Sequence, residues 1–222
     1  MAHVLITGAT GMVGKGVLLS CLKDSSIEKI ILLSRRSVGI SDPKIQELII
    51  EDFANLGAIQ DQIERIDACF HCMGVSSIGM SEEEYTLKTY NYTKILADLC
   101  FTLNPTSTFC YVSGTGTDET ESGRQMWARV KGKTENYVKN KGFYQALLFR
   151  PGMILPEDGI QSATKWYNTI YQILRPFYPI FKKMSSVTTT SRIGAAMIAA
   201  LRNPIVGSAI LHNQQINALA RD

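Results

Sequence analysis

The chain has 222 residues, of which 45% are hydrophobic, and a formal net charge of +3. This length fits one domain that encloses a substantial core, so we expect a single domain over residues 1–222. So small and dispersed a charge argues against a nucleic-acid or membrane partner and favours a small-molecule substrate.

The N-terminal residues MAHVLITG enter a strand-like run directly, without the charged and apolar regions of a signal peptide. The five cysteines are odd in number and lie mostly in apolar runs, which indicates reduced thiols rather than a disulfide framework. No uninterrupted apolar stretch reaches the ~20 residues that a membrane-spanning helix needs. We therefore expect a soluble, cytoplasmic protein.

Short apolar runs alternate with helical periodicity along most of the chain. Such continuous strands, separated by crossover helices, indicate a parallel sheet that is covered on both faces. We therefore predict an α/β fold with a doubly wound, Rossmann-like parallel sheet. The expected strands are residues 3–7, 29–34, 47–51, 67–73, 108–113 and 144–150, and the clearest helices are residues 82–103, 124–141 and 192–202.

Residues 151–183 break this alternation, because prolines and clustered aromatic residues replace the strand and helix patterns. We expect a small cap on the substrate side of the sheet. The alternative is a loop-and-helix appendage that only covers the sheet edge.

The most informative motif is ITGATGMVGKGV, residues 6–17, which follows the first strand and opens the first helix. Gly8 permits a tight exit from the strand, Gly11 lets the backbone approach a diphosphate, and Gly14 lets helix and strand pack closely. The helix N-terminus then offers free N–H groups and a positive dipole end to the anion. This context predicts a dinucleotide-binding site.

The second strand ends in Ser34-Arg35-Arg36, at the place where dinucleotide-binding folds discriminate between cofactors. An acidic residue there binds the free ribose hydroxyl of NAD, whereas an arginine favours the 2′-phosphate of NADP. We therefore expect NADP(H) to be preferred over NAD(H).

The order TGATGMVG, LLSRR, YVSG, VKGK and FRPG resembles the short-chain dehydrogenase/reductase superfamily over about residues 2–202. More narrowly, it is similar to the atypical Tat-interacting-protein-like oxidoreductases and the NmrA-like NADP-binding proteins. The resemblance implies a nicotinamide cofactor. It leaves the activity open, because this branch includes both enzymes and cofactor-binding regulators.

By this resemblance, Asp52 and Phe53 flank the adenine, and Cys72, Met73 and Gly74 pass beneath the cofactor. Asn91 helps to fix the active-site lysine, and residues 151–153 lie against the nicotinamide carboxamide. The full set of expected cofactor contacts is Gly8, Thr10, Gly11, Met12, Val13, Gly14, Arg35, Arg36, Asp52, Phe53, Cys72, Met73, Gly74, Asn91, Lys131, Pro151, Gly152 and Met153.

In such reductases a serine binds the substrate carbonyl, a tyrosine supplies the proton, and a lysine four residues later binds ribose and lowers the tyrosine pKa. Ser113 and Lys131 fall at two of these positions, but the tyrosine position holds Trp127. An indole N–H donates a hydrogen bond but is no general acid near neutral pH. The catalytic role of Trp127 is therefore doubtful. The sequence equally allows Trp127 to be a packing residue or to form a wall of the nicotinamide pocket.

Other residues are weaker candidates. Strand alternation separates Cys72 from Cys69 and His71, so we expect no metal site there. Six side chains are candidates to replace the missing phenol, but each is equally explained as a core, surface or solvated loop group: Tyr90, Tyr92, Tyr111, Tyr137, Asp118 and Glu119.

Two functions remain open, with a third less favoured. The first is an NADP(H)-dependent oxidoreductase that acts on a small carbonyl or alcohol, and the second is a non-catalytic NADP(H)-binding regulator. A nucleotide-sugar epimerase is weaker, because the chain after residue 150 is short for a domain that grips a nucleotide and a sugar. A homodimer through helices 82–103 and 124–141 is also open.

Overall fold

The computed structural model describes residues 1–160, 178–182 and 184–221. A seven-stranded sheet runs through it in the order β3-β2-β1-β4-β5-β6-β9, and every neighbouring pair is parallel. The predicted doubly wound α/β fold is thus confirmed. The strands are β1 (Ala2–Thr7), β2 (Ile27–Ser34), β3 (Ile45–Ile49), β4 (Ala68–His71), β5 (Thr108–Val112), β6 (Gln145–Arg150) and β9 (Gly207–His212).

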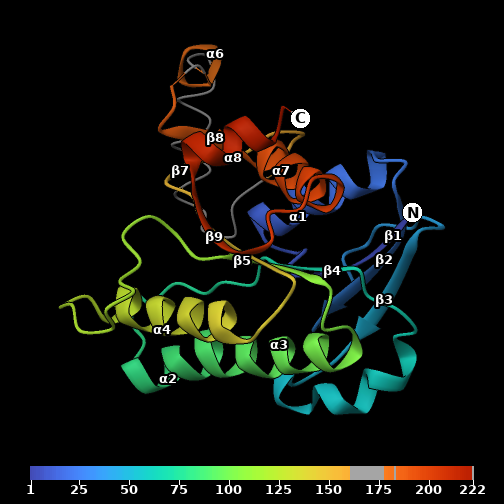
Figure 1. The fold of residues 1–222 in the computed structure, drawn as a ribbon, viewed down its shortest axis with the longest axis horizontal. Helices are drawn as coiled ribbons and strands as arrows, with labels where there is room; N and C mark the ends of the chain where they lie inside the picture. Colours follow the sequence, from blue (N-terminus) through green and yellow to red (C-terminus); the bar gives the residue numbers. More distant parts are fainter. Residues whose placement is uncertain (161–177, 183, 222) are drawn as a thin grey trace.

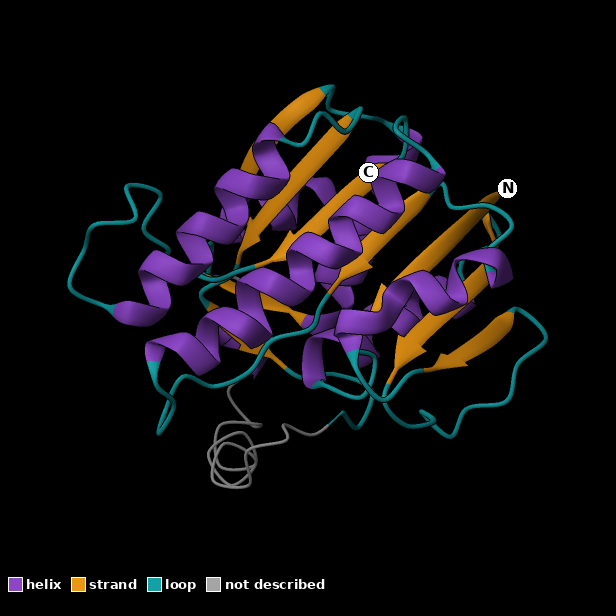
Figure 2. Cartoon of the chain, turned by 90° about the horizontal axis from the view of Figure 1, so that it is seen from below, coloured by secondary structure: helices purple, strands orange, loops and turns teal. Residues whose placement is uncertain are grey.

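Helices cover both faces of this sheet, as Figures 1 and 2 show. On one face α1 (Met12–Lys23) packs against α7 (Thr190–Arg202), with α8 (Asn213–Leu219) beside them. The 3₁₀ helix η1 (Phe53–Gln62), α3 (Tyr92–Leu103) and α4 (Met126–Asn140) cover the other face. Each face has its own apolar core cluster, which explains why the central strands read as continuous apolar runs.

The strand order reverses between β1 and β4, because the chain moves outward on one side of β1 and then returns to its other side. In open parallel sheets, ligands bind in the crevice at the carboxyl ends of the strands at such a switch point. Thr7, at the end of β1, pairs in register with His71, at the end of β4. The glycine motif and the β4–α2 connection therefore meet at this edge.

The helix expected over residues 82–103 is interrupted in the structure. A short helix α2 (Glu82–Thr86) leads into one π-helical turn (Leu87–Asn91), from which α3 continues. A π turn inserts an extra residue and so changes the direction of the side chains around it, and such turns occur frequently at functional sites.

Part of the expected cap over residues 151–183 lies outside the described residues. Of the remainder, β7 (Met153–Leu155) pairs in parallel with β8 (Val187–Thr189), and α6 spans Tyr178–Phe181. The segment after β6 therefore begins a second, two-stranded sheet rather than a simple loop. Within the described ranges, no helix is both long and apolar enough to cross a membrane.

Candidate functional site: a dinucleotide cavity and a lysine-bearing helix

The glycine turn between β1 and α1 has the geometry that its sequence predicts. Gly8 has a φ of +74°, and a Cβ there would lie 2.6 Å from the backbone of Cys72. A Cβ at Gly14 would lie 2.2 Å from the carbonyl oxygen of Gly8. Helix α1 starts directly after Gly11 without a side-chain cap, so its first turn keeps backbone N–H groups for an anion.

A cavity of about 360 Å³ opens beside this turn. It brings together residues from the glycine turn before α1, from the segments that follow β2, β3 and β4, and from the π turn and the start of α3. Half of the expected cofactor contacts line it: Gly8, Thr10, Gly11, Arg35, Arg36, Phe53, Cys72, Met73 and Gly74. The sequence prediction did not name four further lining residues: Glu51, Val75, Lys88 and Tyr92.

This cavity fits the adenosine and diphosphate part of a dinucleotide. The tight turn at its edge depends on glycine at positions 8 and 14, where a Cβ would clash with backbone atoms, and Gly11, which directly precedes the uncapped first turn of α1, lines the cavity. Phe53 and Tyr92 form an aromatic pair in its wall, with ring centroids 5.9 Å apart. Asp52 lies next to this pair and caps η1 by accepting a hydrogen bond from the Ala54 backbone, 2.9 Å.

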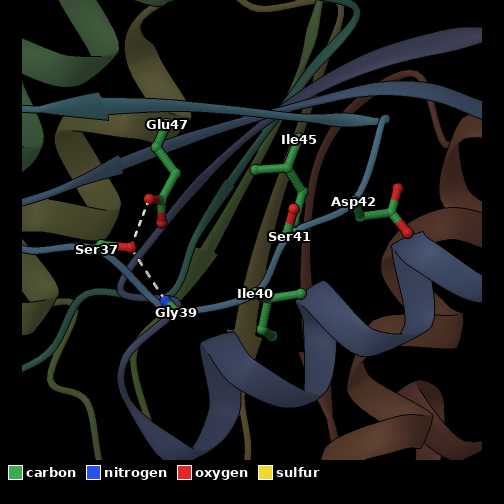
Figure 3. Close-up of a pocket in the computed structure, with 7 residues that line it drawn as sticks. All are labelled: Ser37, Gly39, Ile40, Ser41, Asp42, Ile45 and Glu47. Carbon is green, nitrogen blue, oxygen red and sulfur yellow. Dashed lines mark hydrogen bonds between the residues drawn. The ribbon is translucent and has the colours of Figure 1, made fainter.

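Arg35 and Arg36 are exposed at the end of β2, and none of the described residues forms an ion pair with either guanidinium. The loop that follows them is held by Glu47 of β3 (Figure 3). The Glu47 carboxylate accepts hydrogen bonds from the Ser37 hydroxyl, 2.6 Å, and from the Val38 backbone, 2.8 Å. These two hydrogen bonds fix the loop next to the arginines and leave both cations available to a ligand.

A buried chain of hydrogen bonds joins β1, β4 and α3 next to the lining residues Cys72 and Tyr92. Thr7 contacts His71 Nδ1 at 2.6 Å, His71 Nε2 contacts Thr93 at 2.8 Å, and Thr93 donates to the Thr89 carbonyl at 2.5 Å. Because Thr93 uses its own proton on that carbonyl, it accepts from Nε2, and Nδ1 accepts from Thr7. Burial, aided by the charge of Lys131, lowers the pKa of His71 to about 3, so the ring is neutral and joins β1, β4 and α3.

Trp127, Lys131 and Glu135 lie one turn apart on α4 and so share one helix face. The Lys131 ammonium donates to the backbone carbonyl of Ser113, 2.7 Å, at the end of β5. Burial lowers the pKa of Lys131 to about 8, while the negative charge of Glu135 opposes the shift. The predicted lysine thus lies at the carboxyl edge of the sheet, as the resemblance implies.

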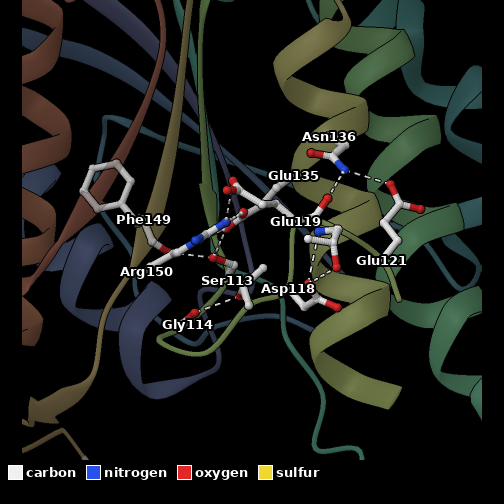
Figure 4. Close-up of polar contacts among 11 residues, drawn as sticks. Ser113, Gly114, Asp118, Glu119, Glu121, Glu135, Asn136, Phe149 and Arg150 are labelled. Atoms are coloured by element: carbon white, nitrogen blue, oxygen red, sulfur yellow. Dashed lines mark hydrogen bonds and ion pairs between the residues drawn. The ribbon is translucent and has the colours of Figure 1, made fainter. Parts of the chain in front are cut away.

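The hydroxyl of Ser113 has buried partners (Figure 4). It donates to the carboxylate of Glu135 and lies 3.1 Å from the Phe149 carbonyl oxygen. Ser113 is therefore held twice by α4, through its carbonyl by Lys131 and through its hydroxyl by Glu135. Its role toward a substrate stays a prediction, and substrate contact would require this hydroxyl to leave Glu135.

Glu135 is itself buried in an ion pair with Arg150, the last residue of β6. The Arg150 Nε lies 3.0 Å from each carboxylate oxygen, and its Nη2 lies 2.5 Å from Oε2. Glu135 raises the pKa of Arg150, and Glu119 of the loop after β5 lies 3.6 Å from the guanidinium. We did not predict this pair from the sequence. Its signals there are Glu135, four residues after Lys131, and the arginine directly before Pro151.

The indole of Trp127 packs against the loop that follows β5. A Cβ placed on Gly116 would lie 3.2 Å from the indole Cη2 atom. Thr115, in the same loop, is exposed and donates to the Arg150 carbonyl at 3.2 Å. We did not predict this second strand-end hydroxyl from the sequence. It lies beside Gly152, because a Cβ placed on Gly152 would be 3.3 Å from the Thr115 hydroxyl oxygen.

Several expected residues lie outside the cavity. Met12, Val13 and Gly14 form the first turn of α1, while Asn91 is exposed and lines a separate hollow with residues 81–84, 86 and 87. The 151–153 stretch is positioned by Asn213, which accepts from the Gly152 backbone at 3.1 Å. The roles of Asn91 and of residues 151–153 toward a cofactor stay predictions.

The candidate replacements for the missing phenol are mostly engaged elsewhere. Tyr111 is buried, and burial raises its pKa well above the usual range. Tyr90 of the π turn and Tyr137 of α4 contact each other edge-to-face. Asp118 caps its own loop, and its hydrogen bonds to Thr120 and Gly123 lower its pKa. None of these four therefore has the geometry of the missing acid.

Residues 4–125 match the model of the NAD-dependent epimerase/dehydratase family, which is more than half of the chain. The chain belongs to this family. Membership supports a nicotinamide dinucleotide as the ligand of the cavity and is consistent with the broader resemblance to short-chain dehydrogenases. It does not test the narrower resemblance to the atypical branch.

Two fungal proteins are similar to this chain in sequence. The mitochondrial protein FMP52 of Chaetomium globosum is 28% identical over 163 residues, which cover 71% of this chain and 68% of that protein. The mitochondrial protein fmp52-2 of Aspergillus oryzae is 26% identical, with coverage of 100% and 98%. The mitochondrial names of these relatives contradict the cytoplasmic location that we expected, and the missing signal-peptide pattern could not have revealed this, because it bears on secretion alone.

Solved structures share the fold of this family member. The short-chain dehydrogenase/reductase YIR035C from Saccharomyces cerevisiae superposes with a TM-score of 0.71 at 12% identity, covering 100% of this chain and 99% of that one. Uronate dehydrogenase from Agrobacterium tumefaciens gives 0.69 at 17% identity, with coverage of 96% and 76%. The enzyme WbmH of Bordetella bronchiseptica, solved with NAD⁺, gives 0.68 at 14% identity, with coverage of 95% and 75%. Identities this low establish the common fold alone.

Proposed function

We propose that the chain binds NADP(H) in this cavity and acts as an oxidoreductase on a small carbonyl or alcohol. The observation that carries the proposal is the assembly of the glycine turn, the aromatic wall and two arginines without an acidic partner around one cavity. Lys131 supports the redox part, because it lies at the same carboxyl edge of the sheet with a lowered pKa.

A bound nicotinamide dinucleotide supplies or accepts the hydride. Lys131 uses one N–H on the Ser113 carbonyl, which leaves its other N–H groups for a ribose or substrate oxygen. The exposed hydroxyl of Thr115 donates to the Arg150 carbonyl, so it reaches a substrate oxygen as a donor only by leaving that carbonyl, just as the Ser113 hydroxyl has to leave Glu135. Trp127 can donate a hydrogen bond but no proton, so the proton comes from water or from another group.

Replacing Arg35 by aspartate is expected to reverse the cofactor preference. The substitution removes a cation that suits a 2′-phosphate and adds a carboxylate that accepts from a free ribose hydroxyl. We expect NADPH affinity to fall about tenfold or more and NADH affinity to be kept or improved, as measured by titration calorimetry. Equal affinities of the native protein for both cofactors would defeat the proposed preference, and Arg65→Asp, away from the cavity, serves as the charge-matched control.

Replacing Trp127 by tyrosine is expected to restore a general acid one turn ahead of Lys131. Such a group contributes about 10²–10⁴-fold to a rate, so a reductase that lacks only its acid should gain strongly. The measurement is the decrease in NADPH absorbance with a panel of small carbonyl compounds, comparing Trp127→Tyr with Trp127→Phe. A gain confined to the tyrosine variant supports the proposal; unchanged turnover in both variants would show that more than the acid is missing.

A second candidate function is an NADP(H)-binding regulator without turnover. Two observations favour it: the tyrosine position holds Trp127, and the Ser113 hydroxyl is held by Glu135. Tight NADPH binding without substrate-dependent oxidation, in both the native protein and Trp127→Tyr, would select this function.

A nucleotide-sugar epimerase is a third candidate that the family match permits. For either function, the names of the fungal relatives support a mitochondrial location.

A further inference from the structure

The cavity contains a cation that neither the glycine motif nor the strand-end arginines account for. Lys88, from the π-helical turn, lines it together with Arg35 and Arg36. Among the described lining residues the only acid is Glu51, so three cations face one carboxylate. A cavity with this balance suits a ligand that carries several negative charges.

The π turn places Lys88 on the cavity side. Lys88 and Tyr92 both line the cavity. Tyr90 lies between them in the chain but faces α4. There its ring contacts Tyr137 edge-to-face, and the Lys133 ammonium lies over it. Burial and the neighbouring Asp52 raise the pKa of Tyr92, and the nearby charges of Lys88 and Arg35 oppose that rise. Lys88 and Arg35 therefore act on the same tyrosine hydroxyl from different segments, the π turn before α3 and the end of β2.

The present partner of Lys88 can be exchanged easily. Its ammonium lies 2.6 Å from the Glu84 carboxylate in an i,i+4 pair, with 36% of the lysine side chain and 47% of the glutamate side chain exposed. Exposed pairs of this kind contribute little to stability, because solvent screens them. A phosphate group offers several oxygens with more charge, so Lys88 gains by turning from Glu84 to a phosphate in the cavity.

We propose that Lys88 is a phosphate-binding residue that closes the nucleotide cavity from the π-helical side. The inference rests on the proposed function, since it takes the ligand of this cavity to be a nicotinamide dinucleotide. The phosphate is either the diphosphate, which NADPH and NADH share, or the 2′-phosphate, which only NADPH carries. Both are the same chemistry for a lysine, and the affinities of the two cofactors distinguish them.

The test is titration calorimetry of the native protein and Lys88→Met with NADPH and with NADH, at two salt concentrations. We expect Lys88→Met to weaken NADPH binding about tenfold or more and to make it less salt-dependent, because one charge contact is lost. An equal loss for NADH assigns the diphosphate, and an unchanged NADH affinity assigns the 2′-phosphate. The matched control is Lys94→Met, because Lys94 forms the same kind of i,i+4 pair with Asp98, 2.7 Å, outside the cavity lining.

Two results would overturn the inference. If native protein and Lys88→Met bind NADPH equally, with equal thermal stability, Lys88 holds no phosphate although the cavity holds the cofactor. If Lys94→Met weakens binding as much as Lys88→Met, the effect belongs to the helix surface as a whole. Absence of binding to either cofactor by the native protein would instead remove the proposed function itself, and the inference with it.

Discussion

Arg150→Met is expected to destabilise the protein by about 3–5 kcal/mol, because it leaves the buried Glu135 carboxylate without its cation. Glu135 is 1% exposed and receives both the guanidinium and the Ser113 hydroxyl. The loss should appear as a lower free energy of unfolding in urea denaturation. The exposed pair Arg65–Asp67, 2.9 Å, gives the control: Arg65→Met should cost about 1 kcal/mol or less.

The double variant Glu135→Gln/Arg150→Met distinguishes a buried charge from lost packing. With both charges removed, no uncompensated ion stays in the core, so the double variant should be more stable than Arg150→Met alone. A double variant that loses the sum of the two single effects would contradict this account. Since Glu135 also holds Ser113, and Lys131 donates to the Ser113 carbonyl, the pair supports the position of the lysine as well as the fold.

Gly14→Ala should abolish dinucleotide binding, with an affinity loss of about 100-fold or more. The added Cβ would lie 2.2 Å from the Gly8 carbonyl oxygen, which is a backbone atom and cannot rotate away. Either the turn moves, and its N–H groups no longer face the diphosphate, or α1 shifts away from β1. Charged hydrogen bonds contribute about 1.5–3 kcal/mol each, so losing more than one accounts for the expected factor.

NADPH titration and thermal unfolding of Gly14→Ala measure these effects together. Gly57→Ala is the matched control, because no other heavy atom lies within 4 Å of the position that its Cβ would take. The control should bind NADPH as the native protein does. Native-like affinity in Gly14→Ala would show that the ligand phosphates do not depend on this turn, and would remove the basis of the proposed cofactor site.

The core of the fold was predictable from local pattern. All six predicted strands exist with shifts of up to two residues at their ends, because strands buried on both faces carry continuous apolar runs that stand out in the sequence. The edge strand β9 was missed, since only one of its six residues is buried and its apolar run is just three residues long. The short pair β7–β8 was missed because each strand has only three residues.

The candidate site, too, was predictable only where its features depend on local sequence. The glycine turn was predictable, because the need for glycine at Gly8 and Gly14 arises from backbone contacts within a few residues and at the next strand. The π turn that directs Lys88 into the cavity was not predictable, since a π turn has the same residue types as the α-helix around it. The engagement of Ser113 was also hidden, because its partners lie 22 and 36 residues away in the chain.

By itself, the sequence determined the parallel α/β sheet, the dinucleotide turn and the places of Trp127 and Lys131, because these depend on local periodicity and on the steric demands of single residues. Only the tertiary structure decided which polar groups are free to act. It buried Glu135 against Arg150, held the Ser113 hydroxyl there, and left Lys88 and the two arginines facing a cavity. The physical reason is that a hydrogen bond or ion pair in a core forms between groups that folding brings together from distant parts of the chain.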